Sequence, residues 1–223
     1  MSNADPAAGA DGKDSSGWKG VVSLTLIAAC AALLVSQIAR MTEAPIERNR
    51  ALQATRTVNA VLPGLEYDNE PGLDIISVRD AELLGSPEPL AVYVARRAGR
   101  PVGYAITAVA PDGYVGPIRL LIGLRADGTV LAVRTLEHRE TPGLGDQIEA
   151  ARSGWLDQYA GLAATSAAAE DWSLRRDGGR FDALSGATIT SRAVVRAVAG
   201  ALQFYRTQLT ELPRVELVAE PDE

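Results

Sequence analysis

The sequence predicts an α+β fold, with a single N-terminal transmembrane helix followed by one domain in which helices flank an antiparallel sheet. Three observations indicate this. Residues 20–39 carry no charge, short β-branched segments alternate with turn signals in the middle of the chain, and an apolar run with helical spacing follows them. There is no strand–helix–strand rhythm and no Gly-x-Gly-x-x-Gly fingerprint, which argues against a doubly wound nucleotide-binding fold.

Composition sets further limits. A chain of 223 residues is long enough for one membrane anchor and one medium-sized domain. The net charge of −6 leaves no sequence-wide basic footprint, so we expect no nucleic-acid partner. The single cysteine and the single histidine exclude an internal disulfide and a Cys/His metal cluster. No carboxylate spacing suggests a metal site either, so no metal is predicted.

The charge-free run has the length of a helix that crosses a bilayer. Trp18 and Lys19 precede it and Arg40 follows it, as interfacial anchors do. A cleaved signal peptide is an alternative, but the run exceeds the usual apolar region and no small-x-small site follows. A lipoprotein signal is another, because Ile27-Ala28-Ala29-Cys30 resembles a lipobox. The chain stays apolar after Cys30, which favours a small side chain facing lipid or a partner helix.

The charges that flank the run predict an orientation of the chain in the membrane. Two lysines precede it, while Arg40, Arg48, Arg50 and Arg56 follow it. Counted simply, the positive-inside rule places the C-terminal domain in the cytoplasm. The expected organisation of the chain is a disordered cytoplasmic tail at 1–17, a transmembrane helix at 18–40, a stalk helix at 41–64, a folded domain at 65–212 and a polar tail at 213–223.

The stalk helix is expected to begin at an N-cap, Thr42, and to stop at Pro63-Gly64. Two hairpins then follow, one turning at Arg96–Pro101 and one at the Asp-Gly turn of Arg125–Gly128. The predicted strands are Asp74–Val78, Leu90–Ala95, Val102–Ala110, Ile118–Leu124 and Val130–Leu136. Two helices are expected after them, Gln147–Tyr159 and Arg192–Leu209.

The hydroxyl-rich segment Ser185-Gly186-Ala187-Thr188-Ile189-Thr190 lies directly before the last helix. The start of a helix exposes unpaired N–H groups and the positive end of a dipole, so it is a natural seat for a phosphate. Gly186 and Ala187 would let the backbone approach a bulky ligand. The alternative is ordinary helix capping by Ser185, Thr188 or Thr190.

Two loops are further candidates for a site. Glu137–Asp146 contains Pro142, Gly143 and Gly145, a tight backbone whose N–H groups could meet a ligand. His138 lies in this loop, and we do not assign it a catalytic role. Ala110–Ile118 carries Tyr114, which is interpreted either as a cover for an aromatic ligand or as a buried core tyrosine.

Several of these segments, in the same order, resemble a known family. Asp182 with the hydroxyl hexad is similar to the flavinylation motif of the FMN-binding subunits of Rnf and Nqr electron-transport complexes. The blocks Ala-Pro-Asp-Gly-Tyr-Val-Gly-Pro-Ile, Glu-Thr-Pro-Gly-Leu-Gly-Asp and Asp-Gly-Gly-Arg-Phe-Asp are similar to the G subunits of Rnf and Rsx complexes. The resemblance covers the chain from the apolar run to about Leu212, and the two tails do not contribute.

The resemblance implies an electron-carrier subunit of a membrane complex, with FMN joined to Thr190 by a phosphoester and no catalytic residue of its own. The implied cofactor-binding residues are Thr190, Ser185, Gly186, Ala187, Thr188, Glu140, Thr141, Gly143, Leu144 and Tyr114. Asp182 is implied to belong to the motif read by a flavin transferase, which would use FAD as donor.

The implied partners are this transferase, the membrane and the other subunits of the Rnf complex. The implied location is the bacterial inner membrane, with the domain on the periplasmic side, opposite to the simple charge count. Two alternatives stay open at this stage. One is the C subunit of a Na⁺-translocating NADH:quinone reductase, and the other is a scaffolding subunit without a cofactor, in which the hydroxyl turn is only a helix cap.

Overall fold

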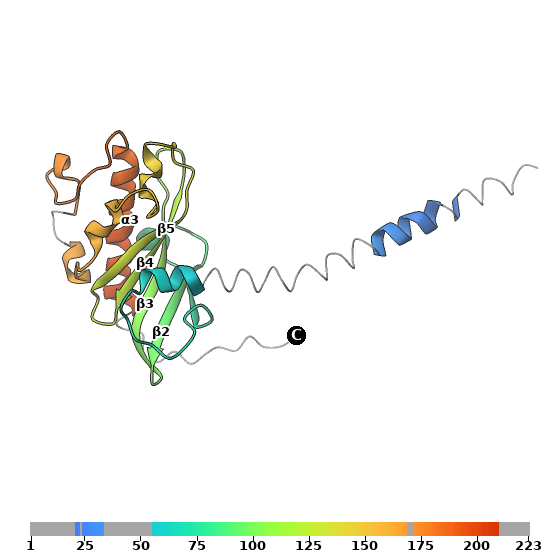
Figure 1. Ribbon diagram of the computed structural model, residues 1–223, viewed down its shortest axis with the longest axis horizontal. Coiled ribbons are helices and arrows are strands. Elements are labelled where there is room, and N and C mark those ends of the chain that lie inside the picture. Colours follow the sequence, from blue (N-terminus) through green and yellow to red (C-terminus); the bar gives the residue numbers. More distant parts are fainter. Residues whose placement is uncertain (1–20, 23, 34–54, 169–171, 210–223) are drawn as a thin grey trace, which may run out of the picture. The chain divides into compact units, whose positions relative to one another are not determined.

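The computed structural model describes residues 21–22, 24–33, 55–168 and 172–209 (Figure 1). Contacts divide the chain into two units, Met1–Arg50 and Ala51–Glu223. In the first unit, the described residues are helical and exposed. Within the described ranges, no helix combines the length and the apolar character that a bilayer-spanning segment requires. The predicted span at 18–40 lies partly outside these ranges, and so does most of the predicted stalk helix. Both predicted tails lie wholly outside them.

A five-stranded antiparallel meander forms the centre of the second unit (Figure 1). Its strands are β1 (Ile75–Val78), β2 (Leu90–Arg97), β3 (Arg100–Ala110), β4 (Ile118–Arg125) and β5 (Val130–Glu137). The order in the sheet is the order in the chain, and each strand pairs with the next. The five predicted strands and their antiparallel arrangement are confirmed.

The hairpin turns fix which loops share an end of the sheet. Ala98 and Gly99 both have positive φ angles, 50° and 75°, so β2 and β3 join by a two-residue turn that is tighter than expected. At the β4–β5 turn, Gly128 has φ 84° and the Thr129 N–H donates to Asp127 Oδ1 at 2.8 Å. Because the strands alternate in direction, these turns lie at one end, and the β3–β4 loop and the end of β5 lie at the other.

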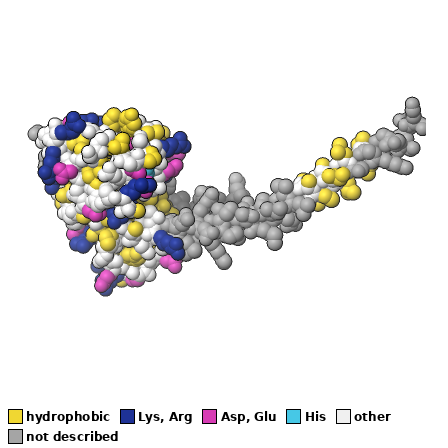
Figure 2. Space-filling model, turned by 45° about the horizontal axis from the view of Figure 1, so that its top comes forward, with side chains coloured by type: hydrophobic (Ala, Val, Ile, Leu, Met, Phe, Trp, Pro, Cys, Tyr) yellow, Lys and Arg dark blue, Asp and Glu magenta, His cyan; other side chains and the backbone are white. Residues whose placement is uncertain are grey.

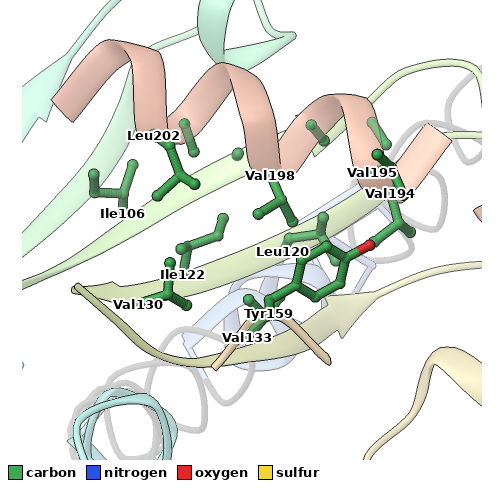
Figure 3. Close-up of a cluster of buried hydrophobic side chains, with 14 of the residues drawn as sticks. Ile106, Leu120, Ile122, Val130, Val133, Tyr159, Val194, Val195, Val198 and Leu202 are labelled. Atoms are coloured by element: carbon green, nitrogen blue, oxygen red, sulfur yellow. The ribbon is translucent and has the colours of Figure 1, made fainter. Parts of the chain in front are cut away.

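Helix α3 (Thr188–Phe204), continued by the π-helical turn η5 (Tyr205–Leu209), covers one face of the sheet. Its apolar stripe packs on the central strands and forms the larger of two cores (Figure 3). A short helix, α2 (Ala81–Leu84), packs against both α3 and β3. A Cβ atom at Gly200 would lie 2.3 Å from the Leu83 carbonyl oxygen, so the two helices touch through their backbones.

A second helix covers the opposite face. Its described part, residues 55–61, contributes Val58 and Val61, which with Leu62 form a smaller core against the sheet. A Cβ atom at Gly123 would lie 1.7 Å from the Val61 carbonyl oxygen, so backbone meets backbone here too. The helix ends before Pro63-Gly64, as predicted, and Gly64 has φ 70°. This end of the helix is therefore packed on the sheet.

The predicted helix Gln147–Tyr159 is wrong. The structure has two separate 3₁₀ turns, η1 (Gly145–Ile148) and η2 (Trp155–Tyr159). Between them, the Ser153 hydroxyl donates to the Gln147 carbonyl at 2.6 Å and accepts from the Trp155 N–H at 3.2 Å. A serine hydroxyl that bonds nearby backbone groups competes with helical hydrogen bonding, and Gly154 adds an entropic cost to a helix.

The predicted start of the last helix is also wrong. Helix α3 begins at Thr188, four residues before the expected Arg192, and changes from α to π geometry after Phe204. The hydroxyl residues of its first turn follow no apolar period, so periodicity alone misses them. The short elements α2, η3 (Ala164–Ala168) and η4 (Arg175–Asp177) were likewise not predicted. Thr188–Thr190 is consequently part of the helix.

The structure predicts a loss of stability at high pH. Burial raises the pKa of Tyr205 to about 12, and Tyr104 and Asp127 act in the same direction. Unfolded tyrosine loses its proton near pH 10. Between these values the unfolded state releases a proton that the folded state keeps, so the free energy of unfolding falls as pH rises. Denaturant titrations from pH 8 to 12 should show this fall.

Burial raises the pKa values of Tyr104 and Tyr159 as well. The fall should therefore be shallower in Tyr205→Phe, but still present. If the free energy of unfolding of Tyr205→Phe falls with pH as steeply as that of the wild type, the raised pKa of Tyr205 is contradicted.

Candidate functional site

Three segments meet where β3 ends, β4 begins and β5 ends. They are the β3–β4 loop (111–117), the loop that follows β5 (138–146) and the segment that leads into α3 (182–190). In Figure 1 they lie together at the upper end of the domain. The meander brings the first two loops to one end of the sheet, and α3 begins at the same end. The predicted site residues all come from these three segments.

A buried pair of side chains joins two of these segments. The Thr190 hydroxyl donates a hydrogen bond to Glu140 Oε2. Thr190 is 1% exposed and Glu140 is 4% exposed. The other carboxylate oxygen, Glu140 Oε1, accepts the Val115 N–H at 3.0 Å, so the β3–β4 loop is tied to the same carboxylate. The two residues that the sequence placed in different candidate motifs are thus in direct contact.

Two glycines leave room for this pair. A Cβ atom at Gly145 would lie 2.8 Å from Glu140 Cβ and 3.3 Å from Thr190 Oγ1. A Cβ atom at Gly113 would lie 2.9 Å from Glu140 Oε1. Contacts this short force neighbouring atoms to move, so side chains at these positions would displace the carboxylate. The glycines keep the backbone close around the Glu140–Thr190 pair.

The turn before α3 is held by a serine. The Ser191 hydroxyl accepts the Leu184 N–H at 2.9 Å and donates to the Ala187 carbonyl at 2.9 Å. The N-cap is Ala187, and no side chain caps the helix. The capping alternative for Ser185, Thr188 and Thr190 is therefore wrong. The N–H groups of the first turn have no intrahelical partner, and no side-chain oxygen within the described part of the chain caps them.

Arginines of η4 lie beside the first turn of α3. Arg176 Nη1 donates to Thr188 Oγ1 at 2.9 Å, and Arg192 binds the carboxylate of Asp177 through two nitrogens, at 2.9 and 3.0 Å. Arg175 forms an ion pair with Asp182 at 3.1 Å. These bonds hold the η4 segment against α3 and bring positive charge to the helix start.

Asp182 itself is exposed and its backbone is fixed. The Asp182 carbonyl accepts the Trp155 Nε1–H at 2.8 Å, and its N–H donates to Gln158 Oε1 at 3.0 Å. Its carboxylate is 64% exposed. Asp182 is therefore presented at the surface, while Thr190 is buried. Ser185 and Gly186 are exposed in the turn between them.

Large apolar side chains are exposed around the site. Tyr114 is 65% exposed, Val115 52%, Ile189 49% and Leu144 45%. Figure 2 shows hydrophobic side chains gathered on the upper part of the domain. A Cβ atom at Gly186, which has φ 76°, would lie 2.9 Å from Leu144 Cδ2, so Leu144 reaches the turn before α3. Tyr114 is consequently not the buried core tyrosine of the alternative interpretation.

The loop after β5 is organised around its own backbone. The Thr141 carbonyl accepts N–H groups of Leu144 and Gly145, at 3.2 and 3.0 Å, and Gly143 has φ 80°, a conformation that favours glycine. His138 Nδ1 accepts the Glu140 N–H at 3.1 Å. His138 Nε2 lies 2.9 Å from Glu149 Oε1, so it carries the proton. His138 supports the loop and contacts neither Thr190 nor the Glu140 carboxylate.

Five residues of the site were not among the predicted site residues. They are Gly113, Val115, Gly145, Arg176 and Ser191. Gly113 and Gly145 lie in the two candidate loops, and the spacing of glycines there is the sequence signal that could have identified them. Val115 acts through its backbone, and Arg176 and Ser191 act through tertiary contacts. No sequence period marks any of these three roles.

A separate pocket of about 520 Å³ lies at the other end of the sheet, next to the two hairpin turns. Its arginines already have acidic neighbours, with Arg97 at 2.7 Å from Glu66 and Arg125 at 4.0 Å from Asp127. Neither Thr190 nor Glu140 lines it. This pocket is distinct from the site described above.

Residues 113–203, which include Glu140 and Thr190, match the family model of the FMN-binding domain. The fold and the site thus define an FMN-binding domain. The G subunit of the ion-translocating oxidoreductase complex of Shewanella piezotolerans is 40% identical over 189 residues, covering 85% of this chain and 89% of the relative. Its counterpart from Yersinia pestis is 42% identical over 195 residues, covering 86% and 93%.

The chain therefore belongs to the RnfG family, the G subunits of ion-translocating oxidoreductase complexes. Among solved structures, a crystal structure of Shewanella oneidensis NqrC matches with a TM-score of 0.39 and 21% identity, covering 62% of this chain and 68% of that chain.

The packing around the pair predicts the effect of a methyl group at Gly145. Gly145→Ala places Cβ within 3.3 Å of both Glu140 and Thr190, so we expect the free energy of unfolding to fall by about 1–3 kcal/mol. Gly116→Ala is the matched control, because a Cβ atom there would meet nothing within 4 Å. Its effect should stay within about 0.5 kcal/mol. Equal stabilities of the two variants in denaturant titrations would refute the described packing.

Proposed function

We propose that this protein carries electrons within an Rnf-type complex and holds FMN covalently through a phosphoester on Thr190. The observation that carries the proposal is the Thr190 hydroxyl, which lies in the first turn of α3 and donates to Glu140 in a domain of the FMN-binding family. FMN supplies reversible electron transfer through its own ring. The protein contributes attachment, position and electrostatics.

The start of α3 suits the phosphate of such a linkage. Its first N–H groups have no side-chain cap, and N–H groups of this kind, with the helix dipole, favour an anion. Arg176, bonded to Thr188, adds a positive charge two residues from Thr190. A phosphodiester carries one negative charge, which these groups would stabilise.

The exposed apolar side chains suit a flat aromatic ring. Tyr114, Leu144 and Ile189 are exposed and come from the three segments that meet at the site, and burying apolar surface under a ring is favourable. Gly186 lets the turn before α3 lie close to Leu144. These residues, with Ser185, Ala187, Thr141 and Gly143, are the proposed contacts of the bound group.

We further propose that a flavin transferase attaches the group and reads Asp182. Asp182 is exposed and its backbone is fixed by Trp155 and Gln158, as a recognition residue requires. Membership in the RnfG family weighs against the C subunit of a quinone reductase. The match to the FMN-binding domain weighs against a scaffolding role without a cofactor.

The membrane anchor and the periplasmic location remain part of the proposal. The anchor is supported by the charge-free run at 20–39 and its flanking Trp18, Lys19 and Arg40. The periplasmic location follows from the resemblance to the Rnf family, against the simple count of flanking charges. A long C-terminal domain can be translocated despite nearby positive charge. The relatives of this chain are subunits of ion-translocating oxidoreductase complexes. The proposed partners of the anchor are the other membrane subunits of such a complex.

Thr190→Val should abolish covalent flavin in protein made in cells that contain the transferase. The measurement is ultraviolet fluorescence of the denatured gel band, together with intact mass. The variant leaves Glu140 Oε2 without its donor, so a loss of about 1–3 kcal/mol in unfolding free energy is expected. Thr190→Ser keeps a hydroxyl and should retain fluorescence.

Thr107→Val is the control for this experiment, because Thr107 is also a buried threonine, 3% exposed, but lies in β3. It should keep the full flavin content. Fluorescence that persists in Thr190→Val would place the flavin elsewhere and refute the proposed linkage.

The location can be tested with a single reporter cysteine. Cys30→Ser removes the native thiol, and Glu88→Cys adds one at an exposed position of the domain. A membrane-impermeant maleimide should label this thiol in intact spheroplasts, and the protein should stay in the membrane fraction after alkaline washing. Protection of the thiol until the inner membrane is broken would place the domain in the cytoplasm.

A further inference from the structure

The Thr190 hydroxyl and the Glu140 carboxylate have the arrangement of a nucleophile and its base. The hydroxyl donates directly to Oε2. The carboxylate is in turn held by a third group, the Val115 N–H, which lies 3.0 Å from Oε1. A base that hydrogen-bonds the nucleophile, and that is itself oriented by another group, is the usual geometry for activating a hydroxyl.

Glu140 is a buried carboxylate that is compensated by hydrogen bonds and, among the described residues, by no ion pair. Burying an ionised carboxylate is unfavourable unless a partner compensates, and no arginine or lysine among the described residues forms an ion pair with Glu140. A neutral amide has one acceptor oxygen, so in this arrangement it could accept only one of the Thr190 and Val115 hydrogen bonds, whereas the carboxylate accepts both. His138 presents an acceptor nitrogen to the Glu140 N–H, and Arg176 donates to Thr188 rather than to Glu140.

We infer that Glu140 is the general base that takes the proton of Thr190 when the flavin phosphate is attached. The inference rests on the proposed linkage of FMN to Thr190. An alcohol is a weak nucleophile at neutral pH and needs a base within hydrogen-bond reach. Glu140 is the carboxylate that touches the reacting oxygen, so it is a catalytic residue of the modification, supplied by the acceptor protein itself.

The step balances without a redox change. The O–H bond of Thr190 breaks and its proton passes to Glu140 Oε2, while a bond forms between Thr190 Oγ1 and the flavin-side phosphorus of a flavin dinucleotide. The pyrophosphate bond of the dinucleotide breaks, and the nucleoside monophosphate leaves with the bonding electron pair.

Access to the hydroxyl requires the covering loop to move. Thr190 is 1% exposed, and its oxygen is approached by the backbone at Gly145, while Leu144 reaches across to Gly186. The Val115 N–H belongs to a different loop. Glu140 therefore keeps its hydrogen bond from the Val115 N–H when the segment around Gly143–Gly145 is displaced.

The test is the single-turnover rate of covalent flavin incorporation. It uses the full chain purified in detergent from cells without the transferase, the purified transferase and FAD. Glu140→Gln keeps the shape and one acceptor oxygen but removes the base, so the rate should fall by about 10²-fold or more. Glu140→Asp keeps a carboxylate on a shorter side chain and should be intermediate. Asp146→Asn, at a carboxylate that is also buried, 3% exposed, should react at the wild-type rate.

Chemical rescue separates a missing base from a damaged fold. Glu140→Ala should be slow, and added formate should accelerate it without affecting the wild type. Unfolding midpoints of all variants show which are folded at the reaction temperature. Incorporation by Glu140→Gln at the wild-type rate, or the absence of rescue in a folded Glu140→Ala, would overturn the role of Glu140. A wild-type chain that takes up no flavin would instead refute the proposed linkage.

Discussion

The hydrogen bond between Thr190 and Glu140 is the contact on which the site depends. It joins residues 50 positions apart, and the Val115 N–H bound to the same carboxylate adds the third segment of the site. A buried hydroxyl and a buried carboxylate are each costly when unpaired, so either side chain fixes the position of the other. Gly113 and Gly145 matter because their missing side chains allow this pairing.

The sheet explains why the pair can form. In an antiparallel meander, successive connections lie at alternate ends of the sheet. Here the β2–β3 and β4–β5 turns occupy one end, while the β3–β4 loop and the end of β5 occupy the other. Helix α3 and the helix at 55–61 pack on opposite faces. A close backbone contact at Gly123 holds the helix at 55–61 on the sheet, and another at Gly200 holds α2 on α3. The functional loops therefore extend from a rigid support.

Local patterns predicted the fold better than they predicted the site. β-branched strands and the Asp127-Gly128 turn are short-range signals, and the five strands followed from them. The helix at Gln147–Tyr159 failed because the Ser153 hydroxyl diverts the backbone, an effect that apolar spacing does not report. The motifs containing Glu140 and Thr190 were both recognised, but their contact was not, since pairing across the fold leaves no periodic trace. Ser191 and Arg176 were missed for the same reason.

The electrostatics of the site favour opposite charges at two adjacent points. The start of α3 and Arg176 favour an anion near the first turn, whereas the Glu140 carboxylate, 4% exposed, disfavours a second negative charge beside Thr190. A hydroxyl at Thr190 suits Glu140, because it is neutral and donates to the carboxylate, but it gives the helix start no anion. A phosphodiester there satisfies the helix start but not an ionised Glu140. In the proposed attachment, transfer of the hydroxyl proton to Glu140 would relieve this conflict, because it removes the negative charge beside the new phosphodiester.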